Sequence, residues 1–175
     1  MRYYLLTAFG KDRPGIVKEV SEILYNFNLN IDDSSMIRLN NEFTMMLIVE
    51  DSKNIDIEKV KKEFNILEKK SNLNIALKEV EKEDIPNEDN PIYDIVAYGK
   101  DKVGIIYNIS KLLAKNNINI INLFTNKEKD FYSVLIRIEV DKNFKIQSLN
   151  KELERLRNDL DLKILISEVI KEEEM

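Results

Sequence analysis

A turn of six residues, Gly10 to Gly15, brings together groups that could hold a small ion. The run reads Gly-Lys-Asp-Arg-Pro-Gly and follows a short apolar segment, so it predicts the passage from a strand into a helix. The free N–H groups at the start of a helix, together with the positive end of the helix dipole, attract a carboxylate or phosphate. Gly15 would let a ligand approach the backbone closely, and the carboxylate of Asp12 suits an ammonium group. The turn therefore has the groups that a free α-amino acid needs.

The same residues also have a purely structural interpretation. Asp12 and its counterpart Asp101 are suitable helix N-caps, Pro14 suits the first helical position, and Gly15 could serve close packing. Asn30 and Asn119 stand where the first helix of each half passes into the next strand. Their amides could reach a ligand in the neighbouring turn, or they could end the helix as C-caps. From these residues alone, both interpretations remain open.

Few other residues offer chemistry. The chain has no histidine and no cysteine, which removes the usual base near neutral pH, thiolate nucleophiles, disulfides, and metal sites built on His or Cys. The run Asp32-Asp33-Ser34-Ser35 could bind a cation weakly, but a solvated strand edge is the simpler interpretation, and the second half has Ile121-Asn122-Leu123-Phe124 there. We therefore expect no catalytic residues, no metal and no cofactor.

Composition narrows the class of protein further. The chain has 175 residues, 43% of them hydrophobic, a net charge of −5 and a pI near 5.1, so nucleic acid is an unfavourable direct partner. Its apolar runs are far shorter than the roughly 20 residues that a membrane helix needs. No signal peptide precedes Tyr3, so we expect the mature chain to begin at Met1 and to remain in the cytoplasm.

An internal repeat sets the domain organisation. Shifting the sequence by 89 residues aligns Gly10–Val17 with Gly99–Ile106, and 13 of the 48 pairs from Tyr3 to Glu50 are identical. Between the copies lies a charged stretch with two of the three prolines, which predicts an exposed linker. We expect a first domain at 1–80, a linker at 81–91 and a second domain at 92–175.

Hydrophobic periodicity predicts the same six elements in each half. The first half has strands at 3–9, 31–39, 42–50 and 73–80, and helices at 16–27 and 57–67, with a hairpin turn at Asn40-Asn41. The second half has strands at 92–98, 119–125, 131–140 and 162–170, helices at 103–115 and 145–160, and a turn at 127–130. The order βαββαβ, twice, is α+β and predicts two ferredoxin-like domains, each a four-stranded antiparallel sheet with two helices on one face.

The other face of each sheet needs a cover or a polar surface. The strand at 3–9 is apolar at nearly every position, which predicts burial on both of its faces. Packing between domains or subunits would supply the cover.

These motifs resemble a known family. Gly10–Val17, then Asn30-Ile31-Asp32-Asp33-Ser34, then Glu42-Phe43-Thr44-Met45 are similar to the first half of an ACT domain. The subgroup that the chain most resembles, over nearly its whole length, is the glycine cleavage system transcriptional repressors, which have two ACT domains in tandem. The second copy departs from the pattern, because Val103 replaces the proline and the Asp-Asp-Ser cluster is missing.

The resemblance implies regulation by a small molecule. ACT domains usually bind amino acids at interfaces between paired domains, through the turn after the first strand and the start of the second. Carried over, this implies ligand-binding residues in both copies: Asp12, Arg13, Pro14, Gly15, Ile16, Asn30, Ile31, Asp101, Gly104, Ile105, Asn119 and Ile120. It also implies a partner regulatory protein and a homo-oligomer, most simply a dimer.

The sequence is compatible with three functions of different classes. The leading hypothesis is a non-catalytic amino-acid sensor that regulates a partner in the transcriptional control of amino-acid metabolism. The alternative is a ligand-free protein–protein interaction module with the same fold. An enzyme would have to move protons with carboxylates, lysines and tyrosines alone, which argues against catalysis.

Overall fold

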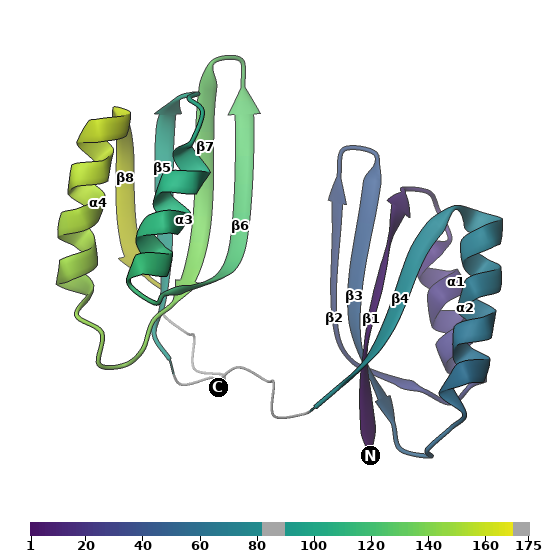
Figure 1. The fold of residues 1–175 in the computed structure, drawn as a ribbon. Helices are drawn as coiled ribbons and strands as arrows, with labels where there is room; N and C mark the ends of the chain where they lie inside the picture. The colour runs from purple at the N-terminus through teal and green to yellow at the C-terminus, as the bar shows by residue number, and fades with distance from the viewer. Residues whose placement is uncertain (82–89, 170–175) are drawn as a thin grey trace, which may run out of the picture. The chain divides into compact units, whose positions relative to one another are not determined.

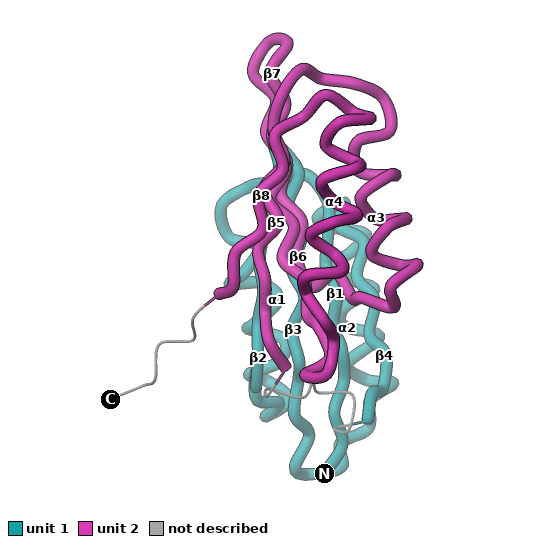
Figure 2. Tube along the Cα trace, turned by 90° about the vertical axis from the view of Figure 1, so that its left-hand side faces the viewer, with its two compact units in different colours: residues 1–86 teal, residues 87–175 magenta. Residues whose placement is uncertain are grey.

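The computed structural model describes residues 1–81 and 90–169 (Figure 1). The chain divides into two compact units, Met1–Pro86 and Asn87–Met175, which Figure 2 colours separately. Each unit has its own hydrophobic core, and no core cluster takes residues from both. Residues 82–89 of the predicted linker lie outside the described residues. In the part of the chain that is described, no helix is both long and apolar enough to cross a bilayer.

Unit 1 is a four-stranded antiparallel sheet in the order β2-β3-β1-β4, with both helices on one face. Its six elements follow one another along the chain: β1 (Arg2–Lys11), α1 (Ile16–Asn26), β2 (Asn30–Leu39), β3 (Glu42–Asp51), α2 (Ile57–Ser71) and β4 (Leu73–Val80).

Unit 2 repeats this topology in the order β6-β7-β5-β8. Its elements are β5 (Ile92–Lys100), α3 (Ile105–Lys115), β6 (Asn119–Glu128), β7 (Phe131–Glu139), α4 (Ile146–Leu160) and β8 (Leu162–Glu168). The prediction of two ferredoxin-like βαββαβ folds is confirmed.

Apolar stripes at helical spacing explain why the helices lie on one face. In α1 the buried residues are Ile16, Val20 and Leu24, and in α3 the equivalent Ile105, Ile109 and Leu113 are buried. They pack on the alternate residues of the central strands, such as Leu6 and Ala8 in β1, which are fully buried. One face of each helix and one face of each sheet thus form the core.

Several predicted boundaries were wrong by one to four residues, the largest error being at the end of α2. β6 continues to Glu128, so the hairpin turn is Lys129-Asp130 rather than the predicted 127–130. α3 begins at Ile105 rather than Val103, because Gly104 occupies the N-cap position in a left-handed conformation. β8 ends at Glu168, and Ile170, the last residue of the predicted strand, lies outside the described residues.

The expectation that β1 is buried on both faces holds only in part. Tyr4, Leu6 and Ala8 face the helices and are buried, whereas on the opposite face only Tyr3 is buried and Phe9 is 50% exposed. The face of the sheet without helices is therefore open toward the end of β1, although its residues are largely apolar.

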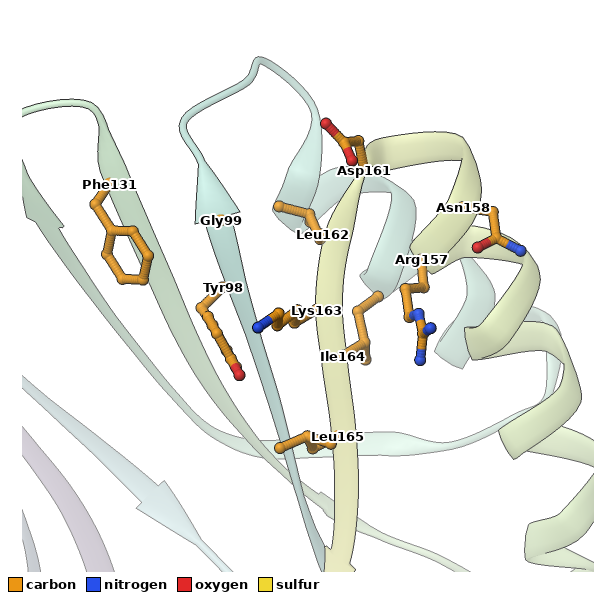
Figure 3. Close-up of a pocket in the computed structure, with 10 residues that line it drawn as sticks. All are labelled: Tyr98, Gly99, Phe131, Arg157, Asn158, Asp161, Leu162, Lys163, Ile164 and Leu165. Carbon is orange, nitrogen blue, oxygen red and sulfur yellow. The ribbon is translucent and has the colours of Figure 1, made fainter.

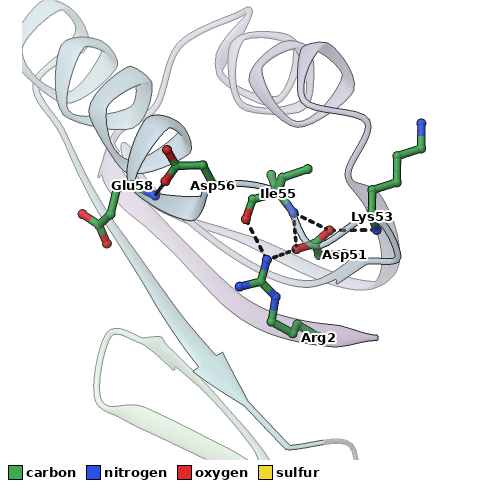
Figure 4. Close-up of polar contacts among 6 residues, drawn as sticks. All are labelled: Arg2, Asp51, Lys53, Ile55, Asp56 and Glu58. Atoms are coloured by element: carbon green, nitrogen blue, oxygen red, sulfur yellow. Dashed lines mark hydrogen bonds and ion pairs between the residues drawn. The ribbon is translucent and has the colours of Figure 1, made fainter.

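A buried carboxylate fixes the connection from β3 to α2 (Figure 4). Asp51 is 1% exposed and accepts a hydrogen bond from Arg2 Nη2 at 2.7 Å and from the backbone N–H groups of Lys53 and Ile55. Arg2 also donates to the Ile55 carbonyl at 2.7 Å. These bonds tie the start of β1 to the loop that leads into α2.

Candidate functional site

The turn between β1 and α1 ends in a glycine that the backbone conformation requires. Gly15 is the N-cap of α1 with φ 97°, a left-handed value that other residues rarely adopt, and no side chain caps the helix. A Cβ on Gly15 would meet nothing closer than 3.8 Å, so φ rather than close packing explains the glycine. The N-cap interpretation of Asp12 is wrong, and so is the placement of Pro14 at the first helical position, which Ile16 takes. With no side-chain cap, the first backbone N–H groups of α1 can donate hydrogen bonds to an external anion.

The charged side chains of this turn are already paired at its rim. Asp12 lies 3.7 Å from Arg38 of β2, and its backbone N–H donates to the Asn41 carbonyl at 2.8 Å. Arg13 donates to both carboxylate oxygens of Glu19, at 3.1 and 2.6 Å. This hydrogen-bonded pair lowers the pKa of Glu19 and raises the pKa of Arg13. At 3.7 Å the Asp12 carboxylate forms an ion pair with Arg38 but accepts no hydrogen bond from it, so the carboxylate oxygens can still accept hydrogen bonds from an ammonium group.

The structure separates the two predicted groups of ligand residues within one unit. Asn30 and Ile31 begin β2, after α1 has run its full 11 residues, which is about 16 Å of helix. Asn28, with φ 55°, takes the left-handed position after the helix, so Asn30 is not the C-cap. A single amino acid cannot span Asp12 and Asn30 of the same unit. Ile16 is only 2% exposed, so only its backbone can face a ligand.

A groove of about 190 Å³ runs between α1 and the edge strand β2 and links these two ends. Val17 and Ser21 of α1 form one wall, and the floor is Met45 and Leu47 of β3. The opposite wall comes from three residues of β2: Ile31, Ser34 and Met36. The groove thus begins one residue beyond Ile16 and reaches Ile31.

Sequence reasoning missed this groove because of a β-bulge. Ile31 pairs with Val49 but Asp33 pairs with Ile48, so Asp32 is an extra residue in β2. One extra residue moves the following side chains to the other face. Ser34 and Met36 consequently stand opposite the buried Leu47 and Met45, on the helix side. Unit 2 has the same bulge between Ile120 and Asn122.

Unit 2 keeps the turn but changes its surroundings. Gly104 is the N-cap of α3 with φ 95°, and the Asn108 side chain donates to its carbonyl at 2.8 Å. Asp101 is not an N-cap either: it accepts a 2.5 Å hydrogen bond from Lys127, which raises the pKa of Lys127. Ile105 is buried, and Val103, in place of Pro14, is fully exposed.

The groove itself differs most between the units. Leu123 occupies in unit 2 the position of Ser34 in unit 1, because Leu123 pairs with Ile136 and Ser34 pairs with the equivalent Leu47. Leu123 is packed against the core. Ile120, at the start of β6, also packs there, whereas Asn119 is exposed. The larger side chain occupies in unit 2 the position that is open in unit 1.

No described residues form a cluster of three or more carboxylates that could hold a metal ion. The arrangement in unit 1 offers backbone amides, a nearby carboxylate and a mostly apolar groove, which are the groups that suit a small zwitterion. The class that the fold defines is a tandem ferredoxin-like protein.

Comparison with known proteins identifies the family. The family model described as "ACT domain" matches residues 2–78 and 95–167, so the chain belongs to the ACT domain family, as its motifs predicted. A UPF0237 protein of Streptococcus mutans is 37% identical over 73 residues, covering 42% of this chain and 83% of that protein. A UPF0237 protein of Neisseria meningitidis is 44% identical over 48 residues, or 27% of this chain, and the match spans about half of that relative's length, 53%.

The resemblance to glycine cleavage repressors is also confirmed. The glycine cleavage system transcriptional repressor of Escherichia coli is 38% identical over 52 residues, covering 30% of this chain and 27% of that protein. A solved structure provisionally assigned as such a repressor matches 97% of this chain and 98% of its own, with a TM-score of 0.74 and 23% identity. An unknown protein from Galdieria sulphuraria matches 97% of this chain and 99% of its own, with a TM-score of 0.81 and 22% identity. The two structures support the tandem fold.

Proposed function

We propose that this protein is a non-catalytic regulator that binds a free amino acid in unit 1 and controls a partner protein, as in the transcriptional regulation of amino-acid metabolism. The observation that carries the proposal is the uncapped start of α1 opening into the groove along β2. The α-carboxylate would lie on the first amides of α1, the ammonium group would face Asp12, and the side chain would enter the groove. Membership of the ACT family and similarity to a glycine cleavage repressor support a regulatory role.

The separation of Asp12 from Asn30 makes pairing part of the proposal. If Asn30 contacts the same ligand as the Asp12–Ile16 turn, it must come from another copy of the fold, whereas Ile31 lines the groove of the same unit. Two copies packed antiparallel along α1 and β2 would bring the turn of one to the start of β2 of the other. Ligand would then favour the paired state, and that population shift would change what a partner protein meets. We propose a cytoplasmic homodimer in which the amino acid sits at this interface.

A thermal-shift scan of the full chain against the twenty amino acids at about 10 mM tests the proposal. A ligand at a hundred times its Kd adds about 2.7 kcal/mol, or roughly 5–10 °C in a protein of this size. We expect one or a few amino acids with small or apolar side chains to raise the melting temperature. If no amino acid raises the melting temperature of the folded protein, the sensor proposal is wrong.

Matched variants locate the response. Ser34→Leu places in the groove the residue that unit 2 already carries at this position, so it should remove the shift without unfolding the protein. Ser35→Leu adds the same side chain on the other face of β2, opposite Met46, and should leave the shift intact. Asp12→Asn should also weaken the shift. A response that survives Ser34→Leu would place the ligand elsewhere.

The second candidate is a ligand-free interaction module, favoured by the edge strand β2. All ten of its residues are exposed, and an edge strand presents unpaired backbone groups to another chain. Sedimentation velocity with and without the amino acids separates the two functions. An interaction module associates regardless of amino acid, whereas the sensor changes its association only with the amino acid that shifts the melting temperature.

A further inference from the structure

A cavity of about 670 Å³ lies in unit 2 beside the edge strand β8 (Figure 3). It is at the end of the sheet where β5 finishes and β7 begins, close to the turn before α3. Its lining includes Tyr98, Phe131, Lys163 and Leu165 on the open face of the sheet, and Arg157 and Asn158 of α4 on the other side of β8, so only part of this volume lies beside the aromatic rings (Figure 3). The proposed amino-acid site uses none of these residues.

Two aromatic rings and one ammonium group converge there. The rings of Tyr98 and Phe131 have centroids 6.1 Å apart at an interplanar angle of 42°, and Lys163 Nζ lies 5.7 Å from the Tyr98 centroid. Figure 3 shows the ammonium group turned toward the Tyr98 ring, and Arg157 on the far side of β8. Phe131 is 50% exposed and Leu165 61% exposed, which is unusually open for large apolar side chains grouped on a sheet.

The positive charge in this group is not neutralised within the described chain. No carboxylate of residues 1–81 or 90–169 forms an ion pair with Lys163, and its ammonium group lies over the Tyr98 ring. The carboxylate that lines the cavity, Asp161, lies 3.7 Å from Lys102 instead. An anion would therefore meet Lys163 without first displacing a partner.

The duplicated unit shows that the fold does not require this group. At the corresponding positions unit 1 has Phe9, Glu42, Asn74 and Ala76, in the same register of the sheet. The aromatic ring of Phe131 is thus replaced by a carboxylate and the ammonium group of Lys163 by an amide. Both sheets form, so packing of the sheet does not explain the aromatic and cationic residues of unit 2.

We propose that this cavity binds a planar aromatic ring that carries a negative group, as in a nucleotide or an aromatic carboxylate. The ring stacks on Phe131 with its edge against Tyr98, and the phosphate or carboxylate pairs with Lys163. Aromatic rings stack favourably on planar ligands, and a lysine held at the rim supplies a point charge for the anion. The site is a second ligand site, independent of the amino-acid site proposed for unit 1.

Calorimetric titration of the full chain at low salt tests this site with four probes. Adenosine 5′-monophosphate and indole-3-acetate carry both features, adenosine carries the ring alone, and inorganic phosphate carries the charge alone. We expect at least one of the two anionic ring compounds to bind saturably at millimolar or lower concentration. It should bind at least about fivefold more tightly than adenosine or phosphate. Which of the two binds distinguishes a nucleotide site from an aromatic-acid site.

Variants taken from unit 1 supply the control. Phe131→Glu and Lys163→Asn introduce the residues that the sheet of unit 1 has at the equivalent positions. Each variant should weaken binding of the anionic probe about tenfold or more. The circular dichroism spectrum should stay unchanged. Lys163→Asn should also abolish the salt dependence of binding and leave adenosine unaffected. The proposal is overturned if neither anionic probe binds the wild-type chain, or if both variants bind as the wild type does.

Discussion

At the scale of single residues, Asp51 is the charged side chain whose contribution to folding stability is most clearly defined by its contacts. It is the charged side chain that the described residues bury most completely, and its carboxylate is satisfied by Arg2 and two backbone N–H groups. Arg2 is partly exposed, so the buried partner carries most of the desolvation cost. The sequence alone does not reveal this role, because Asp51 stands at the end of a strand like any solvated acidic residue.

We predict that Asp51→Asn lowers the free energy of unfolding of unit 1 by about 2–3 kcal/mol, since charged acceptors give the stronger hydrogen bonds and an amide can satisfy only part of this set. Urea denaturation followed by circular dichroism measures the loss. Glu50→Gln is the control, because Glu50 points to the other face of the sheet and has no ion pair within the described chain. Equal midpoints for the two variants would contradict the role assigned to Asp51.

At the scale of elements, a cross-strand ion pair joins β5 and β7 on the open face of unit 2. Arg137 donates to both carboxylate oxygens of Asp94, at 2.7 and 2.8 Å, and this hydrogen bonding lowers the pKa of Asp94. A carboxyl group whose pKa is lowered by folding stabilises the fold above its unfolded pKa, about 3.9 for aspartate. That stabilisation disappears as the pH falls through the lower, folded value.

Asp94→Asn should therefore destabilise unit 2 at pH 7 by about 0.5–1 kcal/mol, the upper range for a partly exposed pair. The difference from the wild type should shrink steadily below about pH 4, where the wild-type carboxyl becomes protonated. Urea midpoints measured from pH 7 down to pH 2.5 give the comparison. A difference that stays constant over this range would show that the pair contributes through packing and not through charge.

The elements also show how far the sequence could be interpreted. The repeat, the six elements of each half and the antiparallel sheets follow from periodicity and turn residues, which local sequence controls directly. The bulge at Asp32 does not, because one extra residue in a strand depends on how that strand pairs with β3. Since the bulge sets which face Ser34 and Met36 occupy, the groove could not be predicted. The turn glycines were recognised, but whether they served the backbone or packing needed the φ values of Gly15 and Gly104.

At the scale of the whole molecule, the duplication has produced two units with the same fold and different surfaces. Unit 1 keeps an open groove beside α1, where unit 2 has Leu123 packed on the core. Unit 2 has an aromatic and cationic group beside β8, where unit 1 has Glu42 and Asn74. The buried stripes of the helices nevertheless occupy corresponding positions in the two units. The two copies can thus differ at these surfaces while each keeps a complete apolar core.

Because each core is complete within its own unit, we predict that the segments 1–81 and 90–175 each fold alone. Each should unfold in a single cooperative urea transition, as domains of about 80 residues with one core commonly do. The two substitutions give a further test. The destabilisation by Asp51→Asn should reappear in segment 1–81, and the destabilisation by Asp94→Asn should reappear in segment 90–175. Each should be within about 0.5 kcal/mol of its value in the full chain. A segment that fails to unfold cooperatively, or a substitution whose effect is lost in its segment, would show instead that the unit depends on the rest of the chain for its stability.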